Sequence, residues 1–210
     1  MTEPVAIAVL AKAPIPGFAK TRLIPTLGAT GAASLQARLI ERAARTACSA
    51  HTGPVTIWAT PEGSDPVFAR LRSDLGIELA HQGEGDLGAR MLAAIAAANA
   101  PTLVIGTDCP ALTHDHVCKA ADMLRARADV VIFPAEDGGY VLIGMREPQP
   151  ALFEGMVWSA PGVMAETRRR LQHRSLAWEE PVTLWDIDTA DDLQRLRALG
   201  LEELIPARDG

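Results

Sequence analysis

The chain has 210 residues, of which 48% are hydrophobic, so it is long enough to form one large domain or two small ones around a buried core. Its formal net charge of −6 at pH 7 excludes a broad basic face, so we expect neither a general nucleic-acid binder nor a membrane-surface binder. No apolar run approaches the ~18 residues that a membrane-spanning helix needs.

Strand and helix patterns alternate along the chain. In chain order we expect a strand at 5–11, a helix at 30–50, a strand at 55–60, a helix at 65–75, a strand at 77–81, a helix at 86–99, a strand at 102–106, a helix at 113–128, strands at 130–134 and 140–145, a helix from about Pro161 to 173, a strand at 182–187 and a helix that begins at 190. The run at 5–11 is continuously apolar, whereas Leu35, Leu39 and Ile40 recur at the spacing of one helix face. Thr113 and Thr189 are suitable N-caps.

This alternation favours an α/β fold with a largely parallel sheet and helices on both faces. We find no repeat and no linker that would divide the chain, so we expect a single domain over residues 1–210. In an open parallel sheet, ligands bind outside the carboxyl ends of the strands. The loops that follow the strands are therefore the segments in which to look for function.

The cysteines and the first residues of the chain indicate in which cellular compartment we expect the protein. Cys48, Cys109 and Cys118 are odd in number and lack CxxC spacing, which fits a reducing cytoplasm with no disulfide framework and no zinc site. The chain opens with Glu3 rather than a basic stretch, so we expect no signal peptide.

The loop after the first strand, KAPIPGFAKTR, is unusual in its basic residues. Lys12 and Lys20 are two of only three lysines in the chain, whereas seventeen basic residues are arginines. Pro14 and Pro16 remove backbone donors, so the loop is not a glycine-rich phosphate cradle, and it lacks the Gly-Lys-Ser/Thr of a Walker motif.

We expect this loop to place Lys20 and Arg22 against ligand phosphates, with its bend at Gly17 and with Ala11 and Lys12 beside the ligand. An exposed loop lysine has little structural role, so replacing Lys20 should leave folding stability nearly unchanged. The alternative is a surface turn with solvated basic residues.

Two segments offer carboxylates at strand ends. In GTDCPAL, Asp108 follows an apolar strand and could hold Mg²⁺, or it could belong to a turn that leads into a helix. In WDIDTADDL, Asp186 and Asp188 are two residues apart and share a face, so both could point at one cation. Alternatively, Asp188 and Thr189 cap the following helix.

Two glycine-containing loops complete the candidates. GEGDLGAR gives backbone access at Gly83 and Gly85, although Asp86 could simply be a helix cap. EDGGY has Gly138 and Gly139, which allow positive φ and close approach of a ligand, although a plain hairpin explains them equally well.

Taken in order, AKAPIPGFAKTRL, GDLGARM, GTDCPAL, DGGYVLIG, WSAPGV and DIDTADDL resemble the bacterial glycosyltransferase-A-like family of radical-SAM/selenodomain-associated transferase 1. The chain is more remotely similar to molybdenum-cofactor guanylyl- and cytidylyltransferases and to phospholactate guanylyltransferase. The resemblance covers about residues 5–200. It implies a nucleotide-diphospho-sugar transferase fold with a mixed, mostly parallel sheet of seven strands, one of them antiparallel.

The same resemblance implies roles for the residues of these motifs. Lys20 and Arg22 would contact nucleotide phosphates, and the turn formed by Asp137, Gly138, Gly139 and Tyr140 would face the acceptor. Asp108, Asp186 and Asp188 would hold Mg²⁺, with Mn²⁺ as a possible substitute. The first loop departs from the better-known nucleotidyltransferases, in which it is glycine-rich and ends in a Gly-Thr-Arg-like run, because here only Gly17 remains.

We therefore expect a Mg²⁺-dependent transferase with Lys20, Arg22 and Asp108 as catalytic residues and Gly83, Gly85 and Asp86 beside the nucleotide. The preferred reaction is nucleotidyl transfer from an NTP to a small acidic or phosphorylated acceptor. A glycosyltransferase that uses a nucleotide-sugar and a non-catalytic nucleotide-binding protein are the alternatives, and fold alone does not choose among them.

Overall fold

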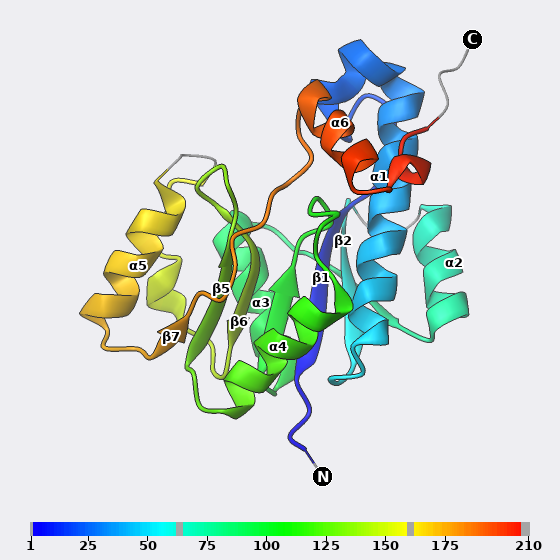
Figure 1. Ribbon diagram of the computed structural model, residues 1–210. Helices are drawn as coiled ribbons and strands as arrows, with labels where there is room; N and C mark the ends of the chain where they lie inside the picture. Colours follow the sequence, from blue (N-terminus) through cyan, green and yellow to red (C-terminus); the bar gives the residue numbers. More distant parts are fainter. Residues whose placement is uncertain (1, 62–64, 159–161, 207–210) are drawn as a thin grey trace.

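The computed structural model describes residues 2–61, 65–158 and 162–206. Its elements alternate as expected (Figure 1). The strands and α-helices are β1 (Ala6–Lys12), α1 (Ile24–Ser49), β2 (Val55–Thr60), α2 (Pro66–Leu75), β3 (Glu78–His81), α3 (Leu87–Ala98), β4 (Thr102–Ile105), α4 (His114–Arg125), β5 (Val130–Pro134), β6 (Tyr140–Met145), α5 (Val163–His173), β7 (Trp178–Glu179) and α6 (Ala190–Ala198). Short 3₁₀ helices cover Thr21–Leu23, Pro150–Leu152 and Glu202–Leu204.

The seven strands form one sheet in the order β3-β2-β1-β4-β6-β5-β7. Strand β6 runs antiparallel to both of its neighbours, and the other pairs are parallel. The centre of the sheet is in register at Ile7, which lies between Val55 of β2 and Leu103 of β4. The mixed, mostly parallel sheet of seven strands with one antiparallel strand is confirmed.

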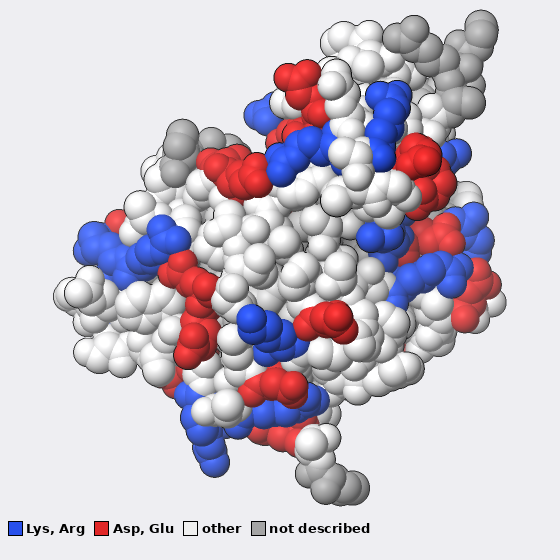
Figure 2. All heavy atoms as spheres, viewed as in Figure 1, with Lys and Arg blue, Asp and Glu red and all other residues white. Residues whose placement is uncertain are grey.

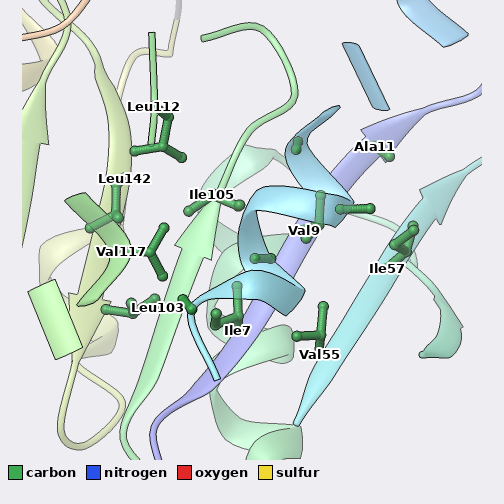
Figure 3. Close-up of a cluster of buried hydrophobic side chains, with 14 of the residues drawn as sticks. Ile7, Val9, Ala11, Val55, Ile57, Leu103, Ile105, Leu112, Val117 and Leu142 are labelled. Carbon is green, nitrogen blue, oxygen red and sulfur yellow. The ribbon is translucent and has the colours of Figure 1, made fainter. Parts of the chain in front are cut away.

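Helices cover both faces of the sheet because its central strands are apolar on both sides. Ile7 and Val9 point into a core beneath α1, α2 and α4, part of which is shown in Figure 3. Ala8, between them, belongs to a second core beneath α3 and α5. This alternation follows from the two-residue period of a strand.

A third apolar cluster lies above the carboxyl edge of the sheet, where α6 packs beside the first part of α1 (Figure 1). Leu23, Leu35 and Leu39 contribute from the N-terminal side, and Trp185 and Ile187 contribute from the segment before α6. The cluster therefore holds the end of the first loop against the DIDT segment, although more than 150 residues of sequence separate them.

Two expected elements differ in the structure. Helix α1 begins at Ile24 rather than at residue 30, with Pro25 in its first turn and a non-helical Gly28 (φ 73°) that kinks it. Residues 182–187 are not a strand of the sheet, because their pairing is limited to one bridge between Leu184 and Ala135. Strand β5 ends at Pro134 and the chain then turns, so no further ladder is available there.

The seventh strand is instead Trp178–Glu179, which pairs with the start of β5. The expected start of a helix at Pro161, and part of the WSAPGV motif, lie outside the described residues. Within the described part of the chain, the helices are too short or too polar to cross a membrane. On the face shown in Figure 2, acidic and basic side chains are interspersed.

Candidate functional site

A cavity of about 520 Å³ opens at the carboxyl ends of β1, β2 and β4 and extends to the start of α3. Parallel strands bring these ends to one edge of the sheet, where backbone groups leave the ladder and side chains can face a ligand. The charged residues that line the cavity are Lys12, Lys20, Arg22, Arg90, Asp108, Asp186 and Asp188. The structure thus brings together the first loop, the loop after β4 and the segment before α6.

Lys20 is the residue that joins these three segments. Its ammonium donates to the carbonyl of Ile187 at 2.6 Å and lies 3.0 Å from Oδ1 of Asp108 and 3.9 Å from Oδ1 of Asp188. Only 4% of its side chain is exposed. The expectation of an exposed lysine with little structural role was wrong, because the left-handed backbone at Lys20 (φ 47°) turns its side chain inward onto acidic partners that sequence spacing does not reveal.

Arg22 is more loosely held. Its Nη1 donates to Oδ2 of Asp188 at 3.1 Å, and 76% of its side chain is exposed. An exposed pair of this kind contributes little to stability, so the guanidinium can leave Asp188 for a ligand oxygen at small cost.

Asp108 is fixed by a chain of hydrogen bonds. The hydroxyl of Thr107 donates to Oδ1 of Asp108 at 3.2 Å, and Nε2 of the buried Gln36 donates to that hydroxyl at 3.1 Å and to the carbonyl of Lys12 at 3.2 Å. The amide of Ile187 donates to the carbonyl of Asp108 at 2.8 Å. Gln36 was not predicted, although a polar residue on the apolar face of α1 was a visible signal.

Asp186 is the most perturbed carboxyl group of the site. Burial is the largest cause that raises its pKa, and the negative charges of Asp108 and Asp137 add to it; with the opposing effect of Lys20 included, the pKa is raised to about 7. Asp186 and Asp188 both line the cavity while Ile187 between them is buried, so the expected shared face is present without a regular strand. Burial and the neighbouring carboxylates thus both favour the protonated form of Asp186.

The residues present suit a divalent cation in ligand type and in charge. Carboxylate oxygens are preferred ligands of Mg²⁺, and Asp108 and Asp188 are 44% and 42% exposed and therefore accessible. Within the described ranges, no three acidic, histidine or cysteine side chains are arranged to hold a metal as they stand. The ammonium of Lys20 lies against two of the three carboxylates instead.

The residues next to Asp188, rather than its own side chain, cap α6. Thr189 is the N-cap of α6, and Oδ2 of Asp192 accepts hydrogen bonds from the amides of Asp188 and Thr189. The capping box is therefore made by Thr189 and Asp192, so the side chain of Asp188 remains available to Lys20 and Arg22.

Gly83, Gly85, Asp86, Ala11 and Gly17 are not among the described residues that line the cavity, although their chain neighbours Gln82 and Leu87 are. Oδ1 of Asp86 accepts from the amide of Ala89 at 2.9 Å and caps α3, as the simpler interpretation proposed. Gly83 and Gly85 have positive φ angles of 71° and 99° and form the turn before that cap. Ala11 is fully buried in β1, and Gly17 forms the expected bend at φ 83°.

The EDGG segment is a hairpin turn between β5 and β6. The amide of Gly139 donates to Oδ1 of Asp137 at 2.9 Å, and Gly138 has a positive φ of 94°. Of the four residues assigned to the acceptor, only Tyr140 lines the cavity. Its ring packs edge-on against Trp158, with ring centres 6.4 Å apart.

The cavity also contains residues that sequence reasoning did not select. Phe18 and Leu87 are 65% and 45% exposed at its edge, and Arg90 reaches it from the first turn of α3. Leu87, Arg90 and Met91 have the three- and four-residue spacing of one helix face, which could have indicated them. Cys109 lies beside Asp108, but burial and then Asp186 raise the pKa of its thiol to about 12, so it is not a reactive nucleophile.

A family model described as "Uncharacterized protein conserved in bacteria (DUF2064)" matches residues 35–160, which is more than half of the chain. No curated protein matches the chain. A crystal structure of a protein from Desulfovibrio desulfuricans G20, provisionally named a nucleotide-diphospho-sugar transferase, is 28% identical, with a TM-score of 0.83 over 94% of this chain and 88% of that one.

Two more distant structures share the fold. CMP:2-keto-3-deoxy-manno-octonic acid synthetase complexed with CTP is 14% identical, with a TM-score of 0.58 over 95% of this chain and 99% of that one. Rv0371c from Mycobacterium tuberculosis H37Rv, complexed with manganese, is 16% identical, with a TM-score of 0.53 over 93% of this chain and 98% of that one.

Proposed function

The chain belongs to the DUF2064 family, and we propose that it is a divalent-metal-dependent nucleotidyltransferase that uses an NTP and a small acidic or phosphorylated acceptor. The observation that carries this proposal is the convergence of Lys20 and Arg22 with Asp108, Asp186 and Asp188 in one cavity at the carboxyl edge of the sheet. The CTP bound by one structural neighbour and the manganese bound by another support the proposal.

In the proposed reaction, an acceptor oxygen attacks the α-phosphorus of the NTP, a new phosphorus–oxygen bond forms, and the bond to the departing pyrophosphate breaks. Such chemistry depends mainly on positioning and charge neutralisation. Asp108 and Asp188, with Asp186 behind them, are the residues that would hold Mg²⁺. When bound, Mg²⁺ supplies positive charge that neutralises the phosphate oxygens.

The chain's own cations then have distinct roles. Arg22 and Lys12 are exposed at the cavity and can bind phosphate oxygens directly. Lys20 is already engaged by Asp108 and the carbonyl of Ile187, so in this conformation it fixes the carboxylates in place. The ammonium has three donors, so contact between Lys20 and a phosphate would use its remaining N–H or replace one of these two partners.

Two points favour the transfer of a sugar instead. Pro14 and Pro16 leave the first loop with fewer backbone donors for a triphosphate, and the 28% identical neighbour carries a provisional sugar-transferase name. In that reaction the same carboxylates would hold a cation beside a departing nucleoside diphosphate.

The identity of the released phosphate tests the proposal. The protein is incubated with Mg²⁺, each of the four common NTPs and a set of small phosphorylated and carboxylic acceptors. Pyrophosphate release that depends on the acceptor and is lost in Asp108→Asn supports nucleotidyl transfer. Release of a nucleoside diphosphate from nucleotide-sugars, without pyrophosphate from NTPs, refutes it in favour of sugar transfer.

A further inference from the structure

Arg90 is a charged side chain whose Nε has no hydrogen-bond partner among the described residues. It lies in the first turn of α3 and lines the cavity, and its Nε is buried without a hydrogen-bond partner. Among the described residues it forms no ion pair, whereas Lys20 and Arg22 in the same cavity are bound to carboxylates. A buried, charged donor without a partner is costly, and an oxygen of a ligand would recover that cost.

Tyr140 is a second unpartnered donor in the same cavity. Its hydroxyl is buried without a hydrogen-bond partner, and burial raises the pKa of the phenol, so the group remains neutral and keeps its proton. The edge-on contact with Trp158 fixes its ring. Tyr140 begins β6, so it reaches the cavity from a different element than Arg90 does.

The charge of the rest of the cavity explains why an anionic ligand would need Arg90. Without Arg90, the three carboxylates of Asp108, Asp186 and Asp188 balance the three cations Lys12, Lys20 and Arg22, so an anion that arrives without its own cation gains little net attraction there. A nucleotide can bring Mg²⁺ with it, but a small acid cannot. Of the cavity's cations in the described chain, Lys12 and Arg90 are those without a carboxylate partner, and Lys12 lies exposed at the end of β1.

We propose that Arg90 and Tyr140 form the acceptor subsite: Arg90 binds the carboxylate or phosphate group of a small organic acid, and Tyr140 hydrogen-bonds another oxygen of the same molecule. Arginine suits both anions because its planar fork can donate two parallel hydrogen bonds. The assignment of this acid as the acceptor rests on the proposed function, but its binding at Arg90 does not.

Side-chain NMR of the full chain, labelled with ¹⁵N, tests the subsite. The Nε–H resonance of Arg90 is assigned from its disappearance in Arg90→Lys. It is then followed while glycerol 3-phosphate, glycerate or glycerol is added at constant ionic strength. We expect the resonance to move with one or both acids and not with glycerol, and the tighter-binding acid identifies the anionic group.

Titrations of variants by the same method, read on backbone resonances, complete the test. Arg90→Gln should weaken binding of the acid about tenfold or more, because a charge-assisted hydrogen bond is lost. Tyr140→Phe should weaken it less, and Arg72→Gln, which replaces an exposed arginine on α2, should leave it unchanged. Arg90→Lys keeps the charge and should retain part of the affinity.

Three results would overturn the subsite: no response of wild-type Arg90 to either acid, an equal response to glycerol, or wild-type affinity in Arg90→Gln. Binding of Mg²⁺ and an NTP is measured in parallel. If Arg90→Gln impairs it as strongly as it impairs acid binding, Arg90 serves the nucleotide and the acceptor assignment is wrong. If the wild type binds the acid but no nucleotide, the subsite stands and the nucleotidyltransferase proposal fails.

Discussion

Replacement of Lys20 by alanine should destabilise the protein, because this one ammonium holds three segments together. The substitution removes the 2.6 Å hydrogen bond to the carbonyl of Ile187 and the 3.0 Å ion pair with Asp108. The carboxylates would then face one another without the cation that lies between them.

The size of the effect follows from burial. A hydrogen bond made by a charged group contributes about 1.5–3 kcal/mol to stability. Asp108 and Asp188 are 44% and 42% exposed, so water can solvate them again and the loss lies at the lower end. We expect about 1–2 kcal/mol. For a chain of this size, that lowers the melting temperature by about 2–8 °C.

Urea and thermal unfolding of the Lys20→Ala protein measure this loss, with Lys119→Ala as the matched control. Lys119 is an exposed lysine on α4, so its removal should leave stability nearly unchanged. If the two variants unfold alike, the ammonium does not hold the loops and the reasoning is wrong.

Three further predictions separate the roles of Asp186, Asp188 and Thr189. The pKa of Asp186 is raised to about 7, above its ordinary value of 3.8, so the stability gained from its proton is full below pH 3.8 and is lost as the pH rises through about 7. In metal-free protein, Asp186→Asn should therefore gain stability relative to the wild type between pH 5 and pH 8, as measured by urea unfolding. Thr189→Ala, which removes the hydroxyl that donates to Oδ2 of Asp192 in the capping box of α6, should lower the free energy of unfolding by about 0.5–2 kcal/mol but leave Mg²⁺-dependent nucleotide binding unchanged. Asp188→Asn should weaken that binding with a smaller effect on stability.

The two aspartate predictions each have a clear contrary outcome. A stability difference for Asp186→Asn that is constant across this pH range would show that the carboxyl group is not perturbed. Loss of stability in Asp188→Asn without any loss of nucleotide binding would show that Asp188 serves the helix rather than a ligand.

The sheet could be predicted from the sequence because strands and helix caps are marked by local patterns of residue types. The apolar run that became β1 and the capping residues Asp86 and Thr189 have effects confined to a few neighbouring residues. The strand expected at 182–187 failed for a non-local reason. The segment is apolar enough for a strand, but it buries Trp185 and Ile187 in the cluster under α6 rather than in the sheet.

The site was predictable in its residue types but not in its connections. Asp108 and Asp188 could be selected because they follow buried segments. The position of Lys20 against them could not be predicted, because it depends on a left-handed backbone at Lys20. It also depends on contacts with residues 88 and 168 positions further along the chain (108 − 20 and 188 − 20). Arg90 was missed because an arginine on a helix is ordinarily solvated. Only the three-dimensional structure reveals that its Nε is buried and that the residue lines the cavity.

Isothermal titration of wild type and Asp108→Asn with the four NTPs, each with and without Mg²⁺, tests the central claim most directly. The substitution keeps the shape of the side chain, and the backbone carbonyl that accepts from Ile187 is untouched, so the loop should persist. We predict that the wild type binds at least one NTP more tightly with Mg²⁺ and that Asp108→Asn loses this dependence. Equal Mg²⁺ dependence in the two proteins, or no NTP binding by the wild type, would contradict the claim that this cavity is a metal-dependent nucleotide site.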